Sequence, residues 1–210
     1  MEIVIAHLPN MALAYLVFFL AVASPGPASL AVAGASMAHG RPQGLAKAAG
    51  ILSGSVLWGL LSVFGLAAFI VSFEGVLYWL KIAGGLYLLW LGFKAAKSAA
   101  AKTDQEMQDV GSKDLRRQYI GGFLIHVTNP KALFAWGAVI TLGLRPDAPW
   151  WMGFVVFAGA YTVSIITMTS FALLFSTKRM MNGYLRLRRW IQGGFAAVFG
   201  LAGAKLIFQS

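Results

Sequence analysis

Residues 24–27 read Ser-Pro-Gly-Pro and residues 128–131 read Thr-Asn-Pro-Lys, and both motifs interrupt long apolar stretches. The first lies within 3–40, which holds no Asp, Glu, Lys or Arg, and the second lies within 119–143, where Lys131 is the only charged residue. A proline inside a helix removes a backbone donor and clashes with the preceding turn, which costs about 3 kcal/mol. The sequence therefore predicts two apolar helices, each broken near its middle.

Each break also has the pattern of a helix start. Ser24 and Asn129 are favoured N-cap residues, and Pro25 and Pro130 then stand at the first helical position, where proline is well tolerated. The two prolines lie half a chain apart. This spacing predicts an internal duplication, whereas a pair of proline kinks used only for helix packing is the alternative.

The composition places the whole chain in a membrane. Hydrophobic residues make up 59% and charged residues 11%, against about 25% charged in an average soluble domain, so a water-soluble protein is excluded. A helix needs about 20 residues to cross the bilayer. Within the hydrocarbon, a helix satisfies all of its backbone hydrogen bonds internally, which an open sheet or a loop does not. We therefore predict an all-α integral membrane protein with six transmembrane helices, at 11–37, 46–71, 76–94, 119–143, 150–175 and 188–208.

The six helices are predicted to form a single membrane domain, 1–210, built from two three-helix repeats. The first repeat is 1–94, a polar cytoplasmic linker follows at 95–118, and the second repeat is 119–210. Three helices are an odd number, so the second repeat enters the membrane inverted. Inverted repeats with broken helices in matching positions are typical of transporters that bind their substrate near the midplane.

The basic residues predict the orientation. Most of the 17 lie in three segments, 41–47, 94–117 and 178–189, whereas the opposite ends of the helices hold Arg145 and Lys205. The positive-inside rule then places the three segments in the cytoplasm and both termini outside. Because these charges set topology, we expect a lipid bilayer and not a nucleic acid as their partner.

The two breaks together form the predicted substrate site. The half-helices after them start at the same depth and run to opposite faces, so both direct their positive ends and unpaired N–H groups at one region. Such a region favours an anion, for example a carboxylate. The predicted substrate-binding residues are Ser24, Pro25, Gly26, Pro27, Thr128, Asn129, Pro130 and Lys131, with Ser55, Tyr87 and Tyr161 as further candidates for the pocket lining.

Lys131 is the most informative single residue. It lies roughly 20 Å along the helix axis from either end, and intramembrane charges usually face a cavity or a partner. No Asp or Glu lies within any predicted span. Its charge could therefore be met by backbone carbonyls freed at the break or by a substrate carboxylate; an uncharged lysine in a wet cavity is the alternative.

The composition also excludes several kinds of chemistry. The chain has no cysteine, and His7, His39 and His126 have no metal-binding spacing, so neither a metal nor another cofactor is expected. No nucleophile–base pair appears, and an enzyme is not predicted.

Four motifs in this order resemble the lysine exporter family, and in particular its RhtB branch of amino-acid exporters. They are Ser24-Pro25-Gly26-Pro27, the glycine-rich stretch 40–54, Gly84-Gly85-Leu86-Tyr87-Leu88 with Leu91-Gly92, and Asn129-Pro130-Lys131-Ala132. The resemblance covers about 11–208. It implies a carrier in the bacterial inner membrane that exports amino acids or close derivatives, using the proton gradient or the membrane potential. We expect the two repeats to rock against each other and so to alternate access to the site.

One position departs from the family pattern. Many relatives have an acidic residue directly after the second glycine of the Gly50-xxx-Gly54 motif, where this chain has Ser55. This departure argues against a carboxylate-based proton relay and against a cationic substrate. We therefore expect a neutral amino acid of the homoserine, threonine or leucine type.

Two other functions stay open. A cation or metal exporter of the same superfamily would need intramembrane Asp, Glu or Cys, or a cluster of His. A non-transporting membrane protein, lipid-handling or structural, would show no amino-acid counterflow. The oligomeric state is also open, with a homodimer as one option.

Overall fold

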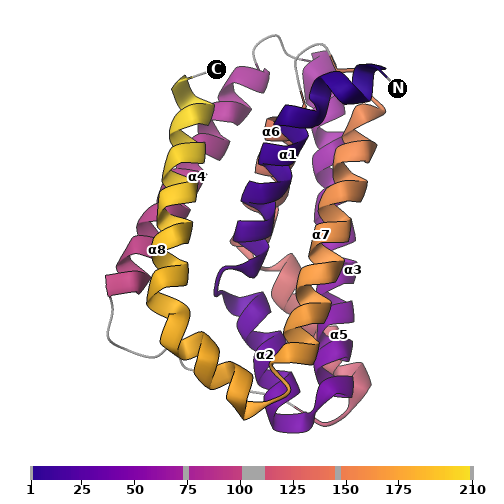
Figure 1. The fold of residues 1–210 in the computed structure, drawn as a ribbon. Helices are drawn as coiled ribbons and strands as arrows, with labels where there is room; N and C mark the ends of the chain where they lie inside the picture. The colour runs from indigo at the N-terminus through magenta and orange to yellow at the C-terminus, as the bar shows by residue number, and fades with distance from the viewer. Residues whose placement is uncertain (1, 73–75, 101–111, 145–147, 209–210) are drawn as a thin grey trace.

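The computed structural model describes residues 2–72, 76–100, 112–144 and 148–208, which form eight α-helices (Figure 1). They are α1 (Glu2–Ala23), α2 (Pro27–His39), α3 (Arg41–Ser72), α4 (Val76–Ala100), α5 (Leu115–Val127), α6 (Pro130–Gly143), α7 (Met152–Leu174) and α8 (Lys178–Phe208). These described residues contain no strand, so the all-α prediction is confirmed for them. The centre of the expected linker, 101–111, and the expected turns at 73–75 and 145–147 lie outside the described residues.

Both predicted breaks are present. The axes of α1 and α2 are bent by 52° relative to each other, and those of α5 and α6 by 62°. Figure 1 shows α1 ending near mid-height of the bundle and α2 continuing to the lower end, while α5 and α6 run in the opposite direction. The two broken pairs are therefore antiparallel, and their breaks lie at a similar height.

Length and apolar composition identify fewer membrane spans than the prediction. Within the described residues, Arg41–Gly65 of α3 and the whole of α7 are long and apolar enough to cross a bilayer, and the total reaches four if each bent pair is one span. The structure is consistent with a membrane protein, and the six-span inverted repeat stays a prediction.

Several helices extend beyond the apolar stretches that predicted them. Helix α1 begins at Glu2 instead of residue 11, α3 at Arg41 instead of 46, α5 at Leu115 instead of 119, and α8 at Lys178 instead of 188. Apolar composition marks where a helix can contact lipid, but its backbone hydrogen bonds continue into polar sequence. Helix α5, for example, starts where Asp114 caps it by accepting a hydrogen bond from the Arg116 amide (2.9 Å).

The helices pack around a shared apolar core. Helices α4 and α8 lie along each other on one side of the bundle, and α6 lies behind α1 (Figure 1). The largest core cluster includes Phe18 of α1, Trp136 of α6 and Phe199 of α8. Helices α3 and α5 approach closely because Gly50, which has no side chain, faces the backbone of Tyr119.

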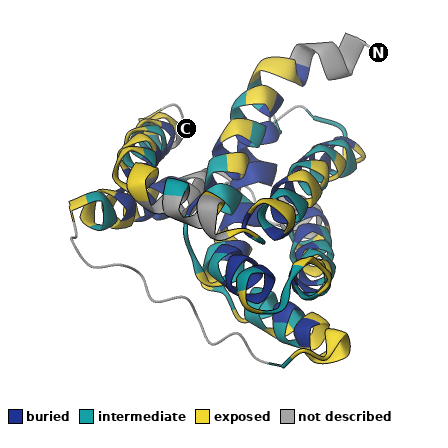
Figure 2. Ribbon diagram, turned by 60° about the horizontal axis from the view of Figure 1, so that its bottom comes forward, coloured by how far each residue is buried: buried dark blue, intermediate teal, exposed yellow. Residues whose placement is uncertain are grey.

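Large apolar side chains also cover the outside of the bundle. Figure 2 shows exposed residues along the outward faces of the helices. Phe64, Ile166 and Leu201 are 57%, 61% and 73% exposed. An apolar outer surface of this kind suits contact with lipid.

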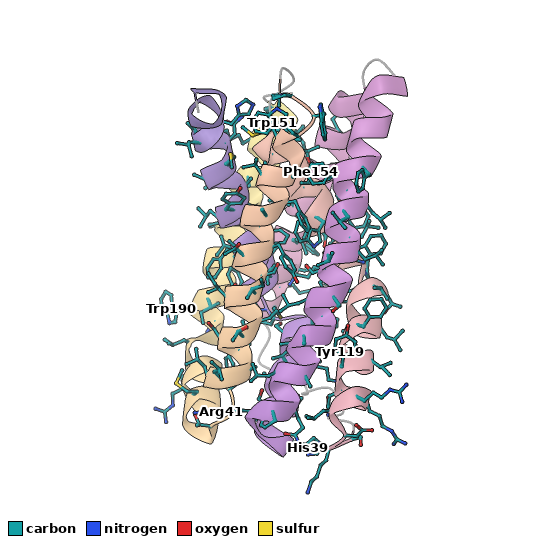
Figure 3. All side chains as sticks on the ribbon, turned by 90° about the vertical axis from the view of Figure 1, so that its right-hand side faces the viewer. His39, Arg41, Tyr119, Trp151, Phe154 and Trp190 are labelled. Carbon is teal, nitrogen blue, oxygen red and sulfur yellow. The ribbon has the colours of Figure 1, made fainter. Side chains whose placement is uncertain are left out.

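The two ends of the bundle differ in chemistry. Figure 3 shows His39 and Arg41 at one end and Trp151 at the other. We call the first the basic end, where α2 meets α3, and the second the aromatic end, where α7 begins. Between α2 and α3, Gly40 has a φ of 98°, a conformation that glycine adopts without strain and that allows the sharp turn.

Candidate functional site

The first break differs from its prediction in one detail. Gly26, not Ser24, is the N-cap of α2, and Pro27, not Pro25, stands at the first helical position. A residue before proline is disfavoured in the helical region, so α2 cannot begin before Pro27. The hydroxyl of Ser24 instead closes α1 by donating a hydrogen bond to the Ala21 carbonyl (3.0 Å).

A serine in the first turn of α2 satisfies the backbone of this break. The Ser29 hydroxyl oxygen accepts a hydrogen bond from the Gly26 amide (3.0 Å). The same hydroxyl lies 3.2 Å from the carbonyl oxygens of Ser24 and Gly26, to either of which it can donate. The extended chain between the two helices is thereby held in place.

The second break has the geometry that the sequence predicts. The side-chain oxygen of Asn129 accepts a hydrogen bond from the Lys131 amide (3.0 Å), and Pro130 stands at the first helical position of α6. The exposed Thr128 turns away from the junction and donates to the Leu124 carbonyl (2.7 Å), which closes α5.

The Lys131 side chain joins the two breaks. Its ammonium group donates to the Ser24 carbonyl oxygen (3.0 Å) and to the Ser24 hydroxyl oxygen (2.5 Å). A Cβ atom on Gly26 would lie 3.3 Å from the same ammonium nitrogen, so the absence of a side chain there makes room for it. A carbonyl freed at the first break therefore meets the charge of Lys131, as one of the sequence-based options expects.

Two cavities adjoin this contact. The wide cavity has a volume of about 450 Å³ and lies between the breaks, α4 and α8; besides the break residues its lining includes Trp90, Lys94 and Gln192. The inner cavity has a volume of about 40 Å³ and lies between the breaks, α3 and α7; its lining includes Ser55, His126 and Ser164. The linings have four residues in common, Ser24, Gly26, Asn129 and Lys131, and contain no Asp or Glu among the described residues.

Seven of the eight predicted break residues line at least one cavity, and Thr128 lines neither. Ser55 lines the inner cavity, where its hydroxyl accepts a hydrogen bond from the Trp136 indole (3.0 Å). Tyr87 and Tyr161 line neither cavity. The Tyr87 ring stacks on Phe134 and the Tyr161 ring on Phe157, so aromatic packing occupies them instead.

The structure adds polar residues that the sequence did not single out. Lys94 belongs to a basic segment, but it lines the wide cavity and its ammonium lies 4.5 Å from the centroid of the Trp90 ring. Gln192 is buried beside the same cavity. His126 and Ser164 line the inner cavity. The available signal was a polar side chain within an apolar stretch, but the sequence alone does not say which of these residues face inward.

These features define a helical membrane protein with two interrupted helices whose broken ends meet at a polar junction beside a cavity. The model of the LysE type translocator family matches residues 19–210. The chain therefore belongs to the LysE type translocator family, whose members are transporters and not enzymes. It is a multi-pass membrane protein.

Three relatives show what this chain is similar to. It is 28% identical to the threonine efflux protein of Escherichia coli K12, over 92% of this chain and 95% of that protein. It is 26% identical to the leucine efflux protein of Klebsiella pneumoniae, over 79% and 77% of the two chains. It is also 26% identical to the homoserine/homoserine lactone efflux protein of Salmonella typhi, over 87% and 88%. No solved structure matches this chain.

Proposed function

We propose that this protein is a secondary transporter that exports neutral amino acids from the bacterial cytoplasm. The observation that carries the proposal is the contact of the Lys131 ammonium group with Ser24, at the junction of two helix N-termini and beside the wide cavity. The names of the relatives support the substrate class, because they denote efflux of threonine, leucine and homoserine or its lactone.

The substrate carboxylate binds at the junction. The N-termini of α2 and α6 both lie there, and each carries the partial positive charge of a helix dipole. Lys131 adds a full positive charge, and no described residue in either lining carries a negative one. A carboxylate replaces Ser24 as the partner of the ammonium group, and a charged hydrogen bond of this kind contributes about 1.5–3 kcal/mol.

The transport pathway consists of two inverted repeats, 1–94 and 119–210, joined by the linker 95–118. In this arrangement α1–α2, α3 and α4 correspond to α5–α6, α7 and α8, which gives six spans in the inner membrane. The start of α1 and the end of α8 lie at the same end of the bundle (Figure 1), as an even number of spans requires. The positive-inside rule puts the basic end in the cytoplasm and both termini outside.

Unequal packing of the two repeats supports alternating access. Helix α4 packs on α6, where Tyr87 stacks on Phe134 with ring centroids 4.4 Å apart. The corresponding pair in the other repeat, α8 and α2, has no comparable packing among the described residues. The wide cavity lies on that side and extends past Leu30 and Ser98 toward the basic end. The arrangement is that of a carrier open to the cytoplasm, and rocking of the repeats closes this side and opens the other.

Counterflow in proteoliposomes tests the proposal. Purified protein is expected to exchange labelled threonine against an internal neutral amino acid. Lys131→Met is expected to lower the exchange rate by about tenfold or more, because the lost charged hydrogen bond is worth more than 1.4 kcal/mol. Lys205→Met is the matched control, since this exposed lysine lies at the far end of α8. Absence of counterflow for every amino acid, or full exchange by a folded Lys131→Met protein, contradicts the proposal.

A further inference from the structure

The inner cavity contains two polar side chains that have no partner. His126 is in the last turn of α5, and neither of its ring nitrogens has a hydrogen-bond partner in the described part of the chain. Ser164 is in the middle of α7, is 3% exposed, and its hydroxyl also has no partner there. Both line the inner cavity. Buried polar groups are nearly always hydrogen-bonded, so two exceptions in one cavity point to a ligand.

Other hydroxyl groups of α7 are satisfied by their own helix, although the described residues include further buried hydroxyls without a partner outside this cavity, those of Ser36 and Tyr87. Thr167, one turn after Ser164 on α7, donates to the Val163 carbonyl (2.7 Å). Thr162 on the same helix donates to the Ala158 carbonyl (2.9 Å). A serine or threonine inside a helix readily bonds to the carbonyl four residues earlier. Ser164 does not, and its hydroxyl remains available to the cavity.

The size of the inner cavity limits what can enter it. Its volume of about 40 Å³ is room for no more than a few water-sized groups, since one ordered water needs roughly 10–15 Å³ on the same measure. A whole amino acid does not fit there but fits the wide cavity of about 450 Å³. The residues common to both linings include Lys131, the carboxylate partner in the proposed function. An amino acid whose carboxylate binds Lys131 can therefore place a short side chain in the inner cavity.

The other charged group of the substrate has a different partner. The C-terminal ends of α1 and α5 lie at the same junction and carry partial negative charge. They attract the α-ammonium group of the substrate, as half-helix C-termini attract cations in other transporters with broken helices. His126 and Ser164 are therefore available to bind the side chain of the substrate.

We propose that His126 and Ser164 recognise a hydroxyl group on the substrate side chain, so that the protein selects short hydroxylated amino acids. This inference rests on the proposed function. A neutral imidazole offers one donor and one acceptor, and a serine hydroxyl offers both, so together they satisfy the donor and the acceptors of a third hydroxyl. An apolar side chain of the same shape leaves both residues unpaired.

Discrimination of this kind is strong. A site that hydrogen-bonds a substrate hydroxyl rejects the analogue that lacks it much more than an apolar pocket rejects one methylene group, because its polar groups are left unpaired. The expected preference for threonine over valine, which differs by a methyl group in place of the hydroxyl, is about tenfold or more in counterflow kcat/KM. The same preference is expected for serine over 2-aminobutyrate.

Counterflow in proteoliposomes with these two pairs is the test. Ser164→Ala and His126→Phe are each expected to lower the threonine-to-valine ratio severalfold or more, and His126→Asn, which keeps a donor and an acceptor, is expected to preserve most of it. Thr167→Val is the matched control, because it removes a buried hydroxyl from the same helix without touching the inner cavity; its ratio is expected to equal that of the wild type.

The outcomes separate this inference from the proposed function. If the wild type exchanges threonine and valine equally, or if Ser164→Ala keeps the wild-type ratio, His126 and Ser164 do not recognise a substrate hydroxyl. The proposed function as an amino-acid transporter is not affected by either result. If no amino acid exchanges at all, the proposed function fails and this inference with it. The wild-type ratio needs no variant, so the inference can be overturned even if the His126→Phe protein misfolds.

Discussion

The two breaks bend the chain by similar angles but use different side chains. The first, 24–27, has two prolines and a glycine, and a serine from the first turn of α2 satisfies its backbone. The second, 128–131, has one proline and is capped by the Asn129 side chain. The bends are 52° and 62°. Both breaks thus have a proline at the helix start and a side chain that satisfies the backbone, but the side chain differs.

The chemical difference between the breaks is the functional one. The first break supplies acceptors, the carbonyl and hydroxyl oxygens of Ser24, and the second supplies the cation of Lys131. A buried ammonium group without partners is costly, and these acceptors offset part of that cost. Each break therefore supplies the hydrogen-bond partner of the other. The loss of transport in a variant is expected to depend on whether the variant removes the cation or one of the acceptors.

Among the break variants that keep Lys131, the largest effect is expected from Gly26→Val. The backbone of Gly26 is extended, with a φ of −171°, so valine is compatible with it. The new side chain, however, starts 3.3 Å from the Lys131 ammonium nitrogen and displaces it from Ser24. Overpacking of this kind costs about 1–3 kcal/mol, and counterflow is expected to fall by roughly tenfold.

Gly137→Val is the control for this variant. A Cβ atom at Gly137, on α6, meets no other atom within 4 Å, so both exchange and the thermal midpoint in detergent are expected to stay close to wild type. Wild-type counterflow in Gly26→Val would show that the contact between the breaks is dispensable.

A smaller effect is expected from removing the cap of the second break. Asn129→Ala leaves the Lys131 amide without its acceptor and is expected to lower the free energy of unfolding by about 1 kcal/mol. Asn129→Ser restores a favoured cap and is expected to recover most of this loss. Thermal unfolding in detergent measures both. Equal midpoints for the alanine variant and the wild type would mean that Pro130 alone defines the start of α6.

The breaks show which parts of the site local sequence can predict. At the second break Asn-Pro is a single local signal, and the helix start follows from it. At the first break two prolines compete, and the choice of Pro27 depends on the residue before it and on the hydroxyl of Ser29. The link from Lys131 to Ser24 spans 107 positions of the chain, so no local pattern contains it.

Tertiary packing explains the rest of what sequence did not predict. Helices α4 and α8 were predicted from their apolar stretches, but their packing along each other joins positions far apart in the sequence and follows from no local pattern. Whether His126 and Ser164 face a cavity depends on how α5 and α7 are rotated against α3, and this rotation is set by contacts such as that of Gly50 with the Tyr119 backbone. Tyr87 and Tyr161 were equally polar candidates, and ring stacking holds them elsewhere.

The smallest effect is expected from Ser24→Ala, because this variant removes only one of the two acceptors of Lys131. The carbonyl of residue 24 still lies 3.0 Å from the ammonium group. Because the ammonium group keeps this second acceptor, transport is expected to change by about two- to tenfold, less than in Lys131→Met. If the substrate carboxylate displaces Ser24, the alanine variant loses a competitor for the ammonium group, and its apparent KM in counterflow should fall and not rise. A raised KM in a well-folded Ser24→Ala protein would instead make the Ser24 hydroxyl a direct substrate contact.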